Sequence, residues 1–159
     1  MDKNVYLKTI LQNVQYKDVK SKFGLYGQKL LVKCIKVVDG DTITIAMCYP
    51  ELDPSKICKV NIRLYGINTP EKRSADKKEV EAAMKCKSFL ENLILNSFIW
   101  VHVPEKESDK YGRILGILYK DEEELNFTYE NSINYLLTQQ KDLHCQNYFG
   151  GTKQEWKFD

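Results

Sequence analysis

The chain has 159 residues, 43% hydrophobic and 29% charged, so it is long enough to bury one core and is neither disordered nor collagen-like. A net charge of +2 does not by itself identify a nucleic-acid-binding protein, because such a function depends on where the charges lie. The chain has five cysteines without C-x-x-C spacing and no secretory leader, which predicts free thiols in an intracellular, reducing compartment. No apolar run reaches membrane-spanning length, so we expect no membrane partner.

Residues 1–28 predict an N-terminal helical and basic extension. Its apolar residues recur at the spacing of one helix face: Leu7, Ile10, Leu11 and Val14. Asp2 or Asn4 is the expected N-cap. Residues 1–33 hold seven Lys against two Asp, a local excess of positive charge. We expect the apolar stripe to dock on the domain; the alternative is a basic arm that contacts a nucleic-acid backbone.

Residues 29–147 carry the pattern of a single domain, followed by a tail at 148–159 without periodic signal. Five strands are predicted from β-branched and apolar runs: 30–38, 42–45, 57–65, 98–103 and 113–119. A two-residue turn signal, Asp39-Gly40, joins the first two strands. The first three strands therefore predict an antiparallel meander.

Two helices are predicted within this domain. The first spans 76–96, with Asp76 or Ser74 at its start and an apolar stripe at spacings of three and four. The residues of that stripe are Val80, Ala83, Cys86, Leu90 and Leu93. The second helix carries the stripe Ile133, Leu136 and Leu137. Three strands, a helix, two strands and a helix predict a mixed α+β fold, a five-stranded OB-fold-type β-barrel with an inserted and a C-terminal helix. We expect the chain to be a monomer.

The segment 63–71 is the first candidate site. Arg63 has the opposite parity to Ile62 and Leu64, so its side chain should point away from the core that the strand covers. An outward guanidinium, followed eight residues later by the carboxylate of Glu71 on a proline-stiffened loop, suits a phosphate clamp beside a base. The alternative is a surface arginine and a surface glutamate on an ordinary turn.

Three motifs lie in order along the chain: D-G-D-T at 39–42, R-L-x-x-x-N-T-P-E at 63–71 and D-K-Y-G-R at 109–113. Together they resemble the staphylococcal nuclease (thermonuclease-like) family, over about residues 30–137. The resemblance implies a calcium-dependent hydrolase, a phosphodiesterase and endonuclease that cleaves DNA and RNA and leaves 3′-phosphate ends.

The motif positions imply a role for each site residue. The implied catalytic residues are Arg63, Glu71 and Arg113. The implied Ca²⁺ ligands are Asp41, Asn68 and the backbone carbonyl of Thr69. Lys110 and Tyr111 are implied to bind substrate; as alternatives, they are a solvated lysine and a tyrosine packed on the barrel rim.

Two positions depart from a regular pattern. Asp41 shares parity with the core residues Ile43 and Ile45, so it must lie at the open end of the barrel, or a bulge must turn it. Asn68 stands where the family has a metal-binding aspartate, which removes one negative charge from the site. Asp39, Glu71 or Asp76 could compensate for this lost charge. Without such compensation, the alternative function is a weak or inactive nucleic-acid- or protein-binding module on the same fold.

Overall fold

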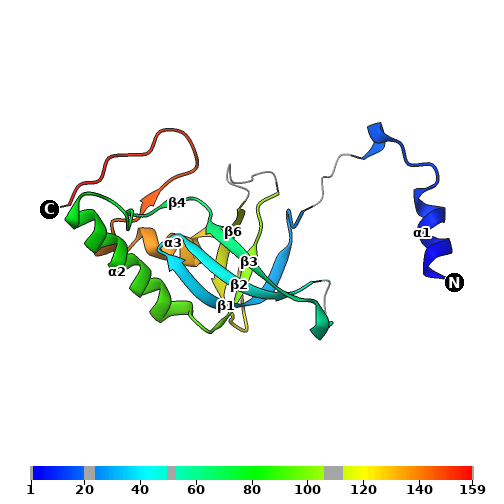
Figure 1. Cartoon of the computed structure of the whole chain (residues 1–159), viewed down its shortest axis with the longest axis horizontal. Helices are drawn as coiled ribbons and strands as arrows, with labels where there is room; N and C mark the ends of the chain where they lie inside the picture. Colours follow the sequence, from blue (N-terminus) through cyan, green and yellow to red (C-terminus); the bar gives the residue numbers. More distant parts are fainter. Residues whose placement is uncertain (1, 20–23, 50–52, 106–112, 159) are drawn as a thin grey trace.

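The computed structural model describes residues 2–19, 24–49, 53–105 and 113–158. Five strands pair in the order β1-β2-β3-β6-β5, and β5 pairs back with β1, so that the sheet closes into a barrel (Figure 1). All pairs are antiparallel except β3 with β6. The strands are β1 (Lys29–Asp39), β2 (Thr42–Cys48), β3 (Ile57–Leu64), β5 (Phe98–His102) and β6 (Ile114–Lys120). The predicted meander and barrel strands are confirmed, with boundaries shifted by a few residues.

The β1–β2 hairpin has its two-residue turn at Gly40 and Asp41, one residue later than predicted. A Cβ on Gly40 would lie 2.5 Å from Cys86 Sγ, so only glycine lets helix α2 pack this close to the turn. Register shifts in β1, the later one between Val37 and Asp39, bend the strand before the turn. Asp41 therefore lies at the end of the barrel, outside β2, as its parity required.

Helix α2 (Lys77–Ile94) is the predicted inserted helix. The Asp76 side chain caps its start by accepting a hydrogen bond from the Lys78 amide at 2.9 Å. After its end, Asn96 takes a left-handed conformation with φ 62°. The buried face is rotated from the predicted one, so that Val80 and Leu93 are only half-buried. The residues that it buries are Glu79, Ala82, Ala83, Cys86, Leu90 and Ile94.

Leu90→Ala is expected to destabilise the protein by about 2–5 kcal/mol, because the Leu90 side chain is fully buried and its loss leaves a cavity. The measurement is the free energy of unfolding in denaturant. Met84→Ala on the same helix is the control, since Met84 is 50% exposed and should cost about 0.5 kcal/mol or less. Equal losses from the two substitutions would show that the buried face of α2 is wrong.

Helix α3 (Ile133–Thr138) is the predicted C-terminal helix, shorter than a typical helix. Ile133 and Leu137 are buried as predicted, and Leu136 is half-buried. A second, two-stranded sheet pairs β4 (Ile67–Asn68) with β7 (Gln146–Asn147). Its strands were not predicted, because two residues are too few to show alternation. The short 3₁₀ segments are η1 (Tyr16–Asp18), η2 (Pro54–Lys56), η3 (Tyr129–Asn131) and η4 (Lys141–Leu143).

Asn134, which is fully buried in α3, joins this helix to the barrel. Its Nδ2 donates to the Tyr65 carbonyl at 2.8 Å and to the Gly116 carbonyl at 3.0 Å, and its Oδ1 accepts from the Leu118 amide at 2.9 Å. The side chain thus supports the parallel contact of β3 with β6, where only three residue pairs are in register.

Asn134→Ala is expected to cost about 2–4 kcal/mol, because it leaves buried backbone groups without their partner. Thermal and denaturant unfolding would measure the loss. The control is Asn131→Ala, since Asn131 is exposed and its side chain donates to the Asn126 carbonyl at 3.2 Å. A loss no larger than that of the control would contradict the structural role of Asn134.

Helix α1 (Lys3–Leu11) forms with Asp2 as its cap, accepting from the Asn4 amide at 2.7 Å. The prediction that α1 docks on the domain is wrong: every residue from 2 to 19 is exposed, and Figure 1 shows α1 far from the barrel. Val5 and Tyr6 lie outside the predicted stripe, so the apolar side chains of α1 do not gather on a single face that could pack on the barrel. Within the described ranges, no helix combines the length and apolar character needed to cross a membrane.

Candidate functional site

The candidate site lies at the end of the barrel where the β1–β2 turn, the end of β3 and the start of β6 meet. The Asp41 carboxylate lies 3.4 Å from Arg63 Nη2 and accepts a hydrogen bond from the Thr42 hydroxyl at 3.0 Å. Arg113 Nη1 in turn donates to the Thr42 hydroxyl at 3.4 Å. The structure thus connects both predicted arginines to one carboxylate: Arg63 of β3 directly, and Arg113, just before β6, through the Thr42 hydroxyl.

Arg63 is not the exposed guanidinium that its parity predicted; the residue is only 9% exposed. Its Nη1 donates to the Leu64 carbonyl at 2.6 Å, and its Nη2 donates to the Ile67 carbonyl at 2.9 Å. The side chain does leave the barrel core, but the loop after β3 folds back over it. Arg63 therefore shapes this loop as well as carrying charge into the site.

The loop after β3 brings Asn68 and Thr69 to the same end of the barrel. Gly66 makes the turn with φ 80°, and its carbonyl accepts from the Tyr148 amide at 2.8 Å. Asn68 is 4% exposed, held where β4 pairs with β7, and Thr69 is 2% exposed. The Thr69 side chain hydrogen-bonds to Asp41, so these two predicted ligand residues are in contact.

Glu71 lies apart from this network. Glu71 is exposed, and its backbone amide donates to the buried Glu79 carboxylate at 3.4 Å. Among the described residues, no hydrogen bond or ion pair joins the Glu71 carboxylate to Arg63 or Arg113. Lys110 and Tyr111, predicted to bind substrate, lie outside the described residues.

Asp39 and Asp41 form an interacting carboxyl pair at the hairpin. Burial, reinforced by hydrogen bonding to Asp41 and repulsion from it, raises the pKa of Asp39 to about 6, against the opposing charge of Lys72. Burial also disfavours the charge on Asp41, but Arg63 and hydrogen bonds from Asp39, Thr69 and Thr42 hold its pKa below the usual value. The two carboxyls therefore titrate as an interacting pair, in which Asp39 takes up a proton before Asp41 as the pH falls.

This donor set fits a hard cation. Within the described residues, no group of three or more His, Cys, Asp or Glu could hold a metal ion, so neutral oxygens must complete any site. Asp41 hydrogen-bonds to Asp39 and to Thr69, the neighbour of Asn68. A cation bound there would compete with protonation of these carboxyls. Carboxylate, amide and backbone carbonyl oxygens are the ligands that Ca²⁺ takes in proteins.

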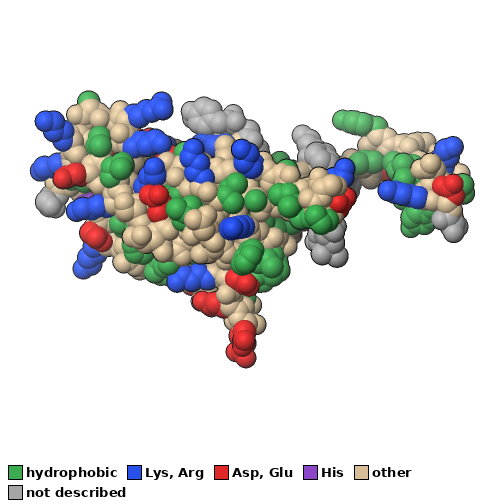
Figure 2. Space-filling view, turned by 60° about the horizontal axis from the view of Figure 1, so that its bottom comes forward, with side chains coloured by type: hydrophobic (Ala, Val, Ile, Leu, Met, Phe, Trp, Pro, Cys, Tyr) green, Lys and Arg blue, Asp and Glu red, His purple; other side chains and the backbone are tan. Residues whose placement is uncertain are grey.

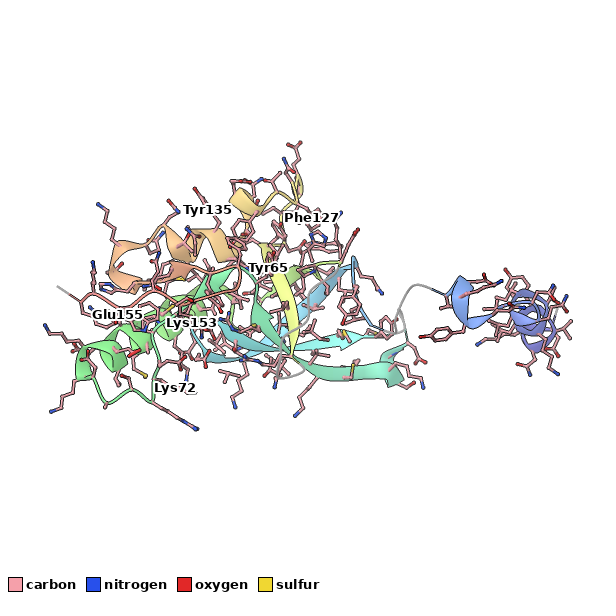
Figure 3. The ribbon with its side chains drawn as sticks, turned by 90° about the horizontal axis from the view of Figure 1, so that it is seen from above. Tyr65, Lys72, Phe127, Tyr135, Lys153 and Glu155 are labelled. Carbon is pink, nitrogen blue, oxygen red and sulfur yellow. The ribbon has the colours of Figure 1, made fainter. Side chains whose placement is uncertain are left out.

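Two residues of this region were not predicted as site residues. Thr42 links Arg113 to Asp41, although the D-G-D-T motif contains it. Lys72, labelled in Figure 3, donates from Nζ to the Val38 carbonyl at 3.1 Å and adds positive charge beside Asp39. A lysine one residue after the last motif carries no sequence signal that separates it from any surface lysine.

Aromatic rings line the loop after β3. The Tyr65 and Phe149 rings are 5.5 Å apart, and Tyr129 lies 5.8 Å from Phe149 and 6.1 Å from Tyr135. Phe149 is 58% exposed, so part of this cluster is open to solvent. Such rings provide flat surfaces on which unpaired bases can stack.

Fold and site together define a nuclease-like or nucleic-acid-binding module: a five-stranded barrel with two arginines and a carboxyl pair at one end. The model of the family described as staphylococcal nuclease homologue matches residues 61–140, just over half of the chain, and the chain belongs to this family. The matched segment contains 63–71 and Arg113, whereas Asp41 precedes it. A comparison with curated protein sequences gave no match.

Proposed function

We propose that the protein is a Ca²⁺-dependent nuclease that hydrolyses phosphodiester bonds of DNA or RNA and leaves 3′-phosphate ends. The observation that carries this proposal is the connection of Arg63 and Arg113 to Asp41 at one end of the barrel. Two guanidiniums beside a carboxylate that can bind a cation suit the negative charge of a phosphodiester under attack. A purely structural site does not require both arginines.

In this proposal Arg63 and Arg113 donate hydrogen bonds to the equatorial phosphate oxygens, where negative charge grows in the transition state. Glu71 accepts a proton from the attacking water or orients it, from the exposed loop. The water oxygen bonds to phosphorus, the bond to the 5′ oxygen breaks, and that oxygen leaves with a proton. Bound Ca²⁺, held by Asp41, Asn68 and the Thr69 carbonyl, would supply neutralising charge at the phosphate.

The second candidate is a nucleic-acid- or protein-binding module without turnover. Asn68 favours it, because an amide oxygen in place of a carboxylate lowers the negative charge that attracts Ca²⁺. The separation of Glu71 from the arginine network also favours it.

Incubation of the full chain with single-stranded DNA separates the two candidates. The nuclease requires cleavage with Ca²⁺ and none with chelator, and its products should be extended by a polymerase only after phosphatase treatment. Binding of the DNA without cleavage at any Ca²⁺ concentration would establish the binding module instead.

Glu71→Gln is expected to lower kcat by about 10²-fold or more with little change in KM, because the amide cannot accept the proton in the transition state. The measurement is steady-state cleavage of a labelled oligonucleotide at saturating Ca²⁺. Glu81→Gln is the control, because Glu81 is an exposed glutamate on α2. An unchanged kcat in Glu71→Gln would show that Glu71 takes no part in the reaction.

A further inference from the structure

The outer face of the β1–β2–β3 meander extends along the strands from the candidate site toward the other end of the barrel. Inward residues of β2, such as Ile43 and Ile45, are fully buried, so Thr44 and Ala46 point outward. Strand pairing extends these positions into two cross-strand rows. The rows are Lys36–Thr44–Asn61 and, one step further from the site, Lys33–Ala46–Lys59.

These rows, which we call the lysine track, form an open and positively charged surface. Its lysines and Asn61 are exposed, and the half-buried Thr44 and Ala46 form a low floor between them. Thr44 donates to Asn61 at 2.8 Å, which fixes the floor. Figure 1 shows α2 and α3 toward one end of the barrel, and Figure 2 shows many Lys and Arg side chains over the body of the molecule. None of the six residues of the track is acidic.

The track is continuous with the candidate site. The next row is Asp39–Thr42–Arg63, which contains the carboxyl and guanidinium groups described above. Lys72, bonded to the Val38 carbonyl, adds a positive charge where the track meets this row. Successive outward rows are about 6.6 Å apart, and three strands span about 10 Å, which suits one extended strand and not the width of a broad protein surface.

We propose that the lysine track binds the phosphodiester backbone of one polynucleotide strand whose scissile phosphate lies at Arg63 and Arg113; the proposal rests on the proposed function. Lysine ammonium groups neutralise phosphates without reading bases, and the floor between them carries no aromatic ring. The track therefore supplies affinity that is independent of base sequence, and it acts on long substrates only.

The test compares two variants of the full chain with equal loss of charge. The track variant carries Lys33→Gln, Lys36→Gln and Lys59→Gln; the control variant carries Lys77→Gln, Lys78→Gln and Lys85→Gln on the exposed side of α2. Binding to a fluorescent single strand of about 20 nucleotides is measured by anisotropy in chelator across a salt series. The track variant should lose about 10-fold in affinity or more at low salt, and its slope of log K against log salt should fall by about 2. The control variant should stay close to the wild type.

Cleavage kinetics with Ca²⁺ give the second readout. The track variant should show a raised KM on the long strand, an unchanged kcat, and wild-type kinetics on a dinucleotide, which is too short to reach the track. Equal losses in the two variants, or no loss in either, would overturn the proposal. Equal competition by polyglutamate, or equal binding to anionic lipid vesicles, would also overturn it, because the track would then bind anions without preference for polynucleotide.

The two proposals fail separately. A wild-type chain that never cleaves, but binds the single strand through the track lysines, would refute the nuclease and leave the track in place. A chain that cleaves normally, with a track variant equal to the wild type in both readouts, would refute the track and leave the nuclease in place.

Discussion

Arg113→Lys is expected to lower kcat by about 10²-fold while leaving the thermal unfolding midpoint nearly unchanged. Lysine keeps the positive charge but loses the planar fork that offers paired donors to phosphate oxygens. Arg113 is half-buried and lies just before β6, donating to Thr42 at 3.4 Å, so its replacement removes little packing. Steady-state cleavage of a labelled oligonucleotide at saturating Ca²⁺ measures the effect.

Arg63→Lys is the informative companion, because it should lower both kcat and stability. The Arg63 guanidinium donates to two backbone carbonyls and lies beside the buried Asp41 carboxylate, contacts that an ammonium cannot all replace. Lys85→Arg, on the exposed side of α2, controls for a general effect of exchanging these residue types. If Arg63→Lys and Arg113→Lys both cleave like the wild type, the phosphate does not bind between these residues.

The barrel was predictable because its strands carry strong local signals. The apolar alternation in the sequences of β2 and β3, the turn signal Asp39-Gly40 and the cap at Asp76 each specify structure to within a few residues. The pair β4–β7 was not predictable, because it depends on long-range contact between segments too short to show a period. The position of α1 was missed for a related reason: a spacing of apolar residues predicts a helix but not what the helix contacts.

The site was predictable by residue type but not by environment. Parity placed the Arg63 side chain outside the barrel core, yet the sequence does not show that the segment after Gly66 folds back over it. In the same way, the opposite pKa shifts of Asp39 and Asp41 depend on burial and on the approach of Lys72 and Arg63, which come from other parts of the chain. Motifs therefore identify which groups are present, while their protonation and access follow from tertiary structure.

Asn68→Asp is expected to lower the Ca²⁺ concentration needed for half-maximal cleavage, and Asp41→Asn to raise it sharply or abolish cleavage. A third carboxylate near Asp39 and Asp41 strengthens attraction for the cation, although its desolvation cancels part of the gain. Without Ca²⁺ the added charge should destabilise the protein, because Asn68 is 4% exposed and lies next to the Asp41 contact residue Thr69.

Calcium titrations of cleavage and of the thermal midpoint test this together, since an ion that binds only the folded state raises the midpoint more when it binds more tightly. The Ca²⁺-induced rise should be larger for Asn68→Asp than for the wild type, and small for Asp41→Asn. Asn92→Asp adds the same charge at an exposed position of α2 and should leave both titrations unchanged. An unaltered calcium requirement in Asn68→Asp would mean either that residue 68 does not contact the ion or that a nearby carboxylate such as Asp39 has taken over its role.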